Sequence, residues 1–346
     1  LCAVMIALML VPMFSNGQNY QCQWVHAAGN AAIVTISSQG MDASGDVYVT
    51  GNYLDNNLSF DNSATVLAPN QDTTANKLFL AKYDPEGNLI WAKSFESGDD
   101  VSNPVITIDN QDNIYLTGYF SDYITLGMVT LSQNQVSPNS PEFLAKCDSS
   151  GQVLWAKQIA LTFARYKVSD DGLIALYGAF AEPSITLGNN LTLTNSDNSG
   201  QTTDFLIAEM DNNGNFLWAQ SGGVSGKSEE IDYVAFTQNE QREVSGRCEA
   251  TVTIDGITLN SIGNTSWDAK DWFIARYDTS GNVPWAIRGG ISHLAPIQLK
   301  DGAPDIKTDQ NNNLYFLGIF HDSIMHVDSL TLNGIGTLTG SVMANT

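Results

Sequence analysis

Residues 79–93 read FLAKYDPEGNLIWAK, and this stretch decides the fold. Two runs of aromatic and aliphatic residues flank a short Asp-Pro-Glu-Gly-Asn segment. Such a pattern predicts a β-hairpin, because glycine adopts the positive φ that a tight turn requires. The pattern returns as FLAKCDSSGQVLWAK from residue 143, LIAEMDNNGNFLWAQ from residue 206 and FIARYDTSGNVPWAI from residue 273.

Tryptophan marks the same place in each copy. Five of the seven tryptophans follow one another at intervals of 67, 64, 63 and 67 residues: Trp24, Trp91, Trp155, Trp218 and Trp285. Self-similarity at a fixed period indicates a repeat architecture. We expect each tryptophan to be a core residue of its sheet, buried on both sides.

A second motif opens each repeat. It reads DVYVTG at residues 46–51, NIYLTG at 113–118 and NLYFLG at 313–318, with weaker copies ending at Gly178 and Gly246. A looser strand follows, as in ITLG at residues 124–127. Each repeat therefore holds four short predicted strands, and no segment shows the 3.6-residue period of a helix.

Four-stranded sheets repeated radially predict an all-β protein, a β-propeller. The domain spans residues 18–346, with about five blade units. These units cover residues 40–97, 104–160, 165–223, 230–290 and, incompletely, 304–346. The strand within residues 18–30 either closes the ring of five or belongs to a longer protein with further blades.

The motifs resemble the SBBP β-propeller repeats of secreted bacterial proteins of the Bacteroidetes type. The resemblance rests on D-x-x-G-[ND]-x-Y-x-x-G and F-[LI]-A-K-Y-D-x-x-G-N-x-x-W-A-K, and it covers nearly everything from Asp42 onward. The openings of the third and fourth units depart from it. The family implies a propeller and a secreted or surface location, and it implies no reaction.

The first residues predict export. Residues 1–14 form an almost unbroken apolar run, followed by Ser15-Asn16-Gly17. An apolar run of this length before small residues is typical of a signal peptide, here residues 1–17. The alternative is a buried N-terminal helix. We expect a secreted protein, extracellular or at the cell surface.

Charge excludes two classes of partner. The formal net charge is −22 and the sequence pI is about 4.2. An acidic surface repels nucleic acid and anionic membranes, and no basic patch is present. We expect no nucleic-acid partner and no membrane span.

Calcium is the cofactor that the composition suggests, and we expect no other. Turns rich in Asp and Asn offer oxygen ligands at alternate positions, which suits a hard cation. The candidate ligands are Asp109, Asp112, Asp309 and Asn311. The alternative is an ordinary turn, because Asp and Asn side chains also bond their own backbone.

No catalytic residue stands out. The histidines His26, His293, His321 and His326 have no metal-binding spacing, although His293 lies in the longest non-repeating connection. Tyr119, Phe120, Trp267 and Trp272 would stack on sugars if they were exposed. We therefore expect a non-catalytic propeller that binds protein or carbohydrate, or acts as a scaffold. The alternative is a propeller hydrolase or lyase acting on polysaccharide.

Overall fold

The protein is described here by a computed structural model, which is most complete beyond residue 32. The described residues are 4–5, 10–12, 20–22, 24, 27–29, 33–54, 58–60, 66–67, 75–133, 141–159, 163–260, 271–291, 303–320, 324–327, 330–333 and 338–344. The chain divides into two compact units, Leu1–Leu161 with Asp170–Gly172 and Thr162–Ser169 with Leu173–Thr346.

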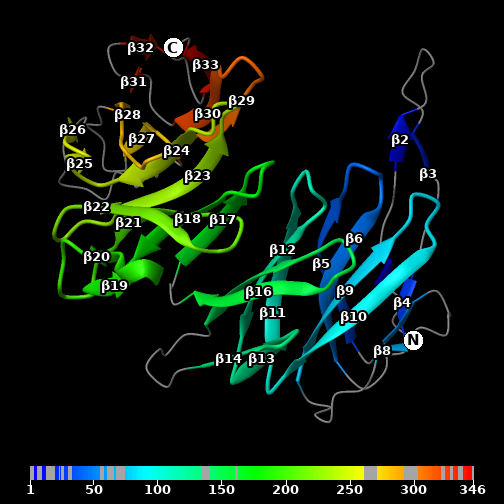
Figure 1. Ribbon diagram of the computed structural model, residues 1–346. Helices are drawn as coiled ribbons and strands as arrows, with labels where there is room; N and C mark the ends of the chain where they lie inside the picture. The colour runs from blue at the N-terminus through cyan, green and yellow to red at the C-terminus, as the bar shows by residue number, and fades with distance from the viewer. Residues whose placement is uncertain are drawn as a thin grey trace. The chain divides into compact units, whose positions relative to one another are not determined.

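The first unit contains repeats 1 and 2, each built on four antiparallel strands in chain order (Figure 1). Repeat 1 consists of β5 (Ile33–Met41), β6 (Val47–Leu54), β9 (Lys77–Tyr83) and β10 (Leu89–Ser97). Repeat 2 consists of β11 (Val101–Ile108), β12 (Ile114–Phe120), β15 (Glu142–Cys147) and β16 (Val153–Ile159). The shorter strands are β1 (Val4–Met5), β2 (Leu10–Pro12), β3 (Tyr20–Cys22), β4 (Ala27–Gly29), β7 (Leu58–Phe60) and β8 (Val66–Leu67).

The second unit contains repeats 3, 4 and 5. Repeat 3 consists of β17 (Phe163–Val168), β18 (Ile174–Phe180), β21 (Asp204–Met210) and β22 (Phe216–Gly222). Repeat 4 consists of β23 (Glu230–Phe236), β24 (Arg242–Cys248), β27 (Asp271–Tyr277) and β28 (Trp285–Ile291). Repeat 5 consists of β29 (Asp305–Thr308), β30 (Leu314–Phe320) and β33 (Leu338–Ala344).

The described residues confirm an all-β chain. They contain no α-helix, and their one helical turn is the 3-10 turn η1 (Gly188–Asn190). In that part of the chain no helix is long and apolar enough to cross a membrane. The closed ring and the number of blades remain predictions.

The identity of one strand in each sheet was wrong in our interpretation of the sequence. The looser strand at residues 124–127 is not part of the four-stranded core of its repeat, because it pairs with the next strand as a hairpin. The first strand of each sheet instead lies before the Asp turn, as β11 does in repeat 2. These first strands have no sequence motif in common. The hairpins are β13 (Tyr123–Leu126) with β14 (Val129–Ser132), β19 (Ser184–Thr186) with β20 (Thr192–Thr194), β25 (Val252–Ile254) with β26 (Ile257–Leu259), and β31 (Ile324–Val327) with β32 (Leu330–Asn333).

Two of these hairpins bridge successive sheets. Strand β13 of repeat 2 pairs with β10 of repeat 1 through Glu96 opposite Thr125 and Ser97 opposite Ile124. Strand β31 pairs with β28 in the same way. These two hairpins therefore lie between the last strands of two neighbouring repeats, whereas β19–β20 and β25–β26 form separate two-stranded sheets.

The third strand of repeats 1 to 4 forms the core of its sheet. Every residue of β9 is buried: Leu78 and Leu80 pack in the cluster shared with repeat 2, and Phe79 and Ala81 pack on the opposite face. A strand covered on both faces is typical of a sheet packed between two neighbours.

The recurring tryptophans are less buried than we predicted. Trp91, Trp155 and Trp218 are half-buried, because each lies on the last strand of its repeat. The residues before them, Ile90, Leu154 and Leu217, are 51%, 51% and 50% exposed.

Trp24, Trp91 and Trp218 instead pack on the turn of the following repeat. The Trp91 Nε1–H donates to the Ser149 carbonyl oxygen at 3.3 Å. The Trp24 Nε1–H donates to the Pro85 carbonyl oxygen at 3.0 Å. Trp24 therefore contacts the turn of repeat 1 in the same way as Trp91 contacts the turn of repeat 2. Gly151 permits the approach: a Cβ there would lie 2.7 Å from Trp91, and its φ is +73°.

Gly151→Ala is expected to destabilise the protein by about 2–4 kcal/mol, through backbone strain and overpacking against Trp91. Gly226→Ala is the matched control, because Gly226 has φ +77° and nothing lies within 4 Å of the added Cβ. This control variant should lose only the free energy of backbone strain, about 1–2 kcal/mol of unfolding free energy. Urea unfolding of both variants measures the difference, and equal losses would contradict the tryptophan contact.

Candidate functional site

The Asp-rich turns share one hydrogen-bond pattern. In each, the aspartate Oδ1 accepts the backbone N–H groups two and four residues further along the chain. The pattern recurs at Asp42, Asp109, Asp148, Asp211, Asp278 and Asp309. This is the geometry by which aspartate stabilises its own turn.

Two of the predicted calcium ligands are engaged in these turns. Asp109 Oδ2 accepts hydrogen bonds from the Asn113 side-chain amide at 2.8 Å and the Tyr115 hydroxyl at 3.1 Å. Asp309 Oδ2 accepts the equivalent bonds from Asn313 and Tyr315 at 2.9 and 3.1 Å. Bonding from Asn313 holds the pKa of Asp309 below its usual range. Both carboxylates therefore have donors at both oxygens.

The other two candidates are not brought together with them as a ligand set. Asn311 enters its turn through its backbone N–H, and Asp112 lies at a positive φ of 61°. Within the described residues no three His, Cys, Asp or Glu side chains gather as a metal site. Calcium binding at these turns stays a prediction.

Of the other candidates, two are core residues, Tyr119 is half-buried on β12, and the rest lie outside the described residues. Phe120 and Trp272 are buried, at 0% and 3% exposure, so neither can stack on a sugar. His26, His293 and His321, the side chain of His326, and Trp267 lie outside the described residues.

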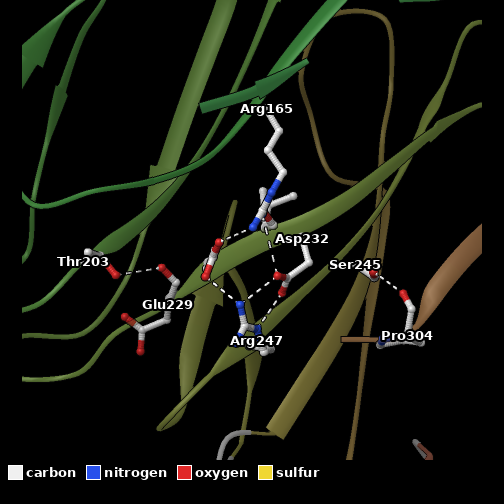
Figure 2. A network of polar contacts seen from close by, with 9 residues as sticks. Arg165, Thr203, Glu229, Asp232, Ser245, Arg247 and Pro304 are labelled. Carbon is white, nitrogen blue, oxygen red and sulfur yellow. Dashed lines mark hydrogen bonds and ion pairs between the residues drawn. The ribbon is translucent and has the colours of Figure 1, made fainter. Parts of the chain in front are cut away.

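A charged network joins β17, β23 and β24 in the second unit (Figure 2). Arg247 holds Asp232 with two bonds of 2.8 Å and Glu230 with one of 2.6 Å. Arg165 pairs with Glu230 at 2.9 Å and donates to the Ile231 carbonyl oxygen at 3.1 Å. Each guanidinium thus faces a carboxylate, and the network ties the first strand of repeat 3 to that of repeat 4.

Glu229 lies beside this network and is fully buried. Burial raises its pKa to about 7, the Val224 N–H opposes the rise, and Asp204 and Glu249 add to it. A raised pKa often marks an active-site acid. Because Glu229 has no exposed surface, we assign it a structural role.

An open groove of about 850 Å³ lies in the first unit, between repeats 1 and 2. One wall is β10 from Ala92 to Glu96, and the second is the turn of hairpin β13–β14 from Thr125 to Val129. The third wall runs from Ser150 to Leu154, at the start of β16. The groove combines aliphatic side chains with one cation, Lys93, whose Nζ lies 5.5 Å from the centre of the Trp91 ring.

The sequence contained a signal for this groove that we missed. The hairpin turn reads Leu-Gly-Met at residues 126–128, where repeat 4 has Ile-Asp-Gly at 254–256. The WAK of β10 becomes WAQ at residues 218–220. Where aligned repeats carry different residues, the shared fold does not require either residue. Both of these sequence differences fall on residues that line the groove.

No family model matches the chain, so the resemblance to SBBP repeats stays a prediction. The chain is similar to an uncharacterized WD repeat-containing protein of Acanthamoeba polyphaga mimivirus, with 22% identity over 362 residues. The match covers 87% of this chain and 25% of the viral protein, so the chain spans about a quarter of that relative's length.

Solved structures give distant likenesses. A protein of unknown function from Bacteroides caccae has 11% identity and a TM-score of 0.36, over 86% of this chain and 74% of that one. A protein of unknown function from Dyadobacter fermentans has 12% identity and a TM-score of 0.38, over 90% and 84%. A family PL25 ulvan lyase with a bound saccharide has 12% identity and a TM-score of 0.42, over 87% and 69%.

Glu229→Gln is expected to change how stability depends on pH. The unfolded chain ionises Glu229 near its ordinary pKa of 4.5, whereas the folded protein retains the proton up to about 7. The wild type therefore loses stability from this group as pH rises through that window. Relative to wild type, the variant should gain about 2–3 kcal/mol between about pH 4 and pH 8 in urea unfolding. An equal difference at both pH values would contradict the shift.

Proposed function

We propose that the protein is an exported, non-catalytic β-propeller that binds a protein or carbohydrate ligand. The repeat pattern, the stacked sheets and the WD repeat-containing relative support the propeller. The apolar run of residues 1–14 supports export. The groove between repeats 1 and 2 is the proposed binding site.

The groove is the observation that carries this proposal. It combines an aliphatic lining with a few polar groups in a concave surface, the usual composition of a ligand site. Leu154, on its wall, is 51% exposed, and its counterpart Leu217 in repeat 3 is 50% exposed. These two residues provide a matched pair for testing whether the groove, and not a general apolar surface, binds ligand.

The polar groups that resemble catalytic ones support a binding role over an enzymatic one. Burial raises the pKa of Tyr177, next to Arg165 and Asp232, so its hydroxyl stays protonated at neutral pH and is no base. Arg165 and Arg247 are each paired with carboxylates. The polysaccharide hydrolase or lyase remains the alternative, and the experiment below separates the two.

We expect the labelled full-length chain to bind on an array of peptides and glycans, with no cleavage of bound polysaccharide. Leu154→Asp should weaken binding at least about tenfold by placing a charge on the apolar wall. Leu217→Asp, the matched control, should leave it unchanged. Absence of any ligand, or release of unsaturated or reducing sugars, would overturn the proposal.

A further inference from the structure

The groove between repeats 1 and 2 has a counterpart between repeats 3 and 4, where side-chain hydrogen bonds close the corresponding position. At the corresponding corner between repeats 3 and 4, the Val283 N–H donates to Asp255 Oδ2 at 2.8 Å. The Gln220 side-chain amide donates to the Gly281 carbonyl oxygen at 2.6 Å. A carboxylate from the hairpin turn and an amide from the previous repeat thus seal this corner.

The groove between repeats 1 and 2 lacks both seals. Gly127 stands at the position of Asp255, and Lys93 at that of Gln220. A Cβ on Gly127 would lie 3.0 Å from Val153, so the two hairpin turns occupy the same place over their strands. Gly127 has no carboxylate to offer, and Lys93 lies over Trp91 instead of crossing the corner.

The backbone of the open corner is nevertheless set for a carboxylate. The Asp148 N–H donates to the Gln152 carbonyl oxygen at 2.9 Å, as the Asp278 N–H does to Asn282 at 2.8 Å. The two turns therefore leave the next residue in the same orientation, and the Val153 N–H points outward as that of Val283 does. No carboxylate of the described residues is bonded to it.

We propose that this groove binds an extended peptide whose carboxylate accepts the Val153 N–H and pairs with Lys93. The inference rests on the proposed binding function and names its ligand class. Asp255 is the internal precedent: it is an aspartate after an aliphatic residue, delivered from a β-strand to the same backbone group in repeat 4. In repeat 2 that carboxylate comes from the ligand.

Charge complementarity directs the carboxylate to this corner. Lys93 is the one cation among the groove's lining residues, in a chain of net charge −22. Glu96, the groove's carboxylate, accepts a hydrogen bond from the Tyr123 hydroxyl at 3.3 Å. A charge-assisted bond to a backbone N–H beside an ammonium group is worth more than a neutral one.

The open edge of β10 favours a peptide over a sugar. Strand β13 pairs with β10 only at Glu96 and Ser97, and no other strand of the described residues pairs with the outer edge from Trp91 to Phe95, beside the groove. A free strand edge accepts an extended chain by strand addition. The flanking Leu126, Val153 and Leu154 suit aliphatic side chains, whereas sugars stack on aromatic faces.

The probe is the acetylated, amidated pentapeptide Val-Thr-Ile-Asp-Gly, compared with its Asn analogue by isothermal titration against the full-length chain. We expect the Asp peptide to bind at least about tenfold more tightly than the Asn peptide. Lys93→Gln and Gly127→Asp, which restore the two seals of repeat 4, should each reduce binding at least about tenfold. Gly127→Asp places aspartate in the left-handed conformation that Asp255 adopts at φ 45°, with its Cβ 3.0 Å from Val153.

The reverse exchange is the matched control. Gln220→Lys with Asp255→Gly opens the corner between repeats 3 and 4, and should add a second site for the same peptide. Equal binding of the two peptides, binding that survives both groove variants, or no binding at millimolar peptide would overturn the inference. If the array instead shows another ligand whose binding is lost in Leu154→Asp, the proposed binding function stands and only the ligand class is wrong. A carboxylated glycan bound at this site would be such a ligand.

Discussion

The structure depends on the burial, on both faces, of the third strand of repeats 1 to 4. Strand β9 has no exposed residue, and β15 and β21 are buried along their length in the same way. Such a sheet cannot be stable alone, because exposing either face would cost the burial of several large side chains. Each of these sheets therefore requires cover on both faces, and within each unit the turns, tryptophans and hairpins fix how closely neighbouring repeats approach.

The sequence was sufficient for the features that recur. The all-β class and the hairpin between the third and fourth strands could be predicted, because each repeats with the same chemistry. Cys147 is fully buried, and burial raises the pKa of its thiol to about 12. The first strand of each sheet was missed: β11 reads VSNPVITI, with an irregular alternation and a proline, and shares no pattern with its counterparts. The groove was missed as well: the differences at residues 126–128 and 93 are visible in the sequence, but they point to one place only once it is known which hairpin turn lies over which strand.

The polar residues between sheets show how the repeats became different. Opposite each other on the second and third strands stand Tyr48 and Lys82 in repeat 1, and Tyr115 and Lys146 in repeat 2. Repeat 3 has Glu209 at the lysine position, and repeat 4 has Arg242 where the others have Val47, Ile114 or Ile174. Glu209 and Arg242 form a buried ion pair. A buried pair adds little stability, but separating its members is costly. It therefore specifies that repeat 4 follows repeat 3.

The same reasoning distinguishes the groove from an accident of packing. Where repeats 3 and 4 meet, two side chains satisfy the backbone groups at the corner, and where repeats 1 and 2 meet, a glycine and a lysine stand at the same positions. Glycine and lysine recur at these positions, as in ITLG at residues 185–188 and WAK at 155–157, so the corner between repeats 3 and 4 is the one that departs from the pattern. The glycine offers no carboxylate to the backbone and the lysine places a cation beside it, so together they favour an incoming negative charge. The aspartate and glutamine of repeats 3 and 4 show how the same corner is closed from within the chain.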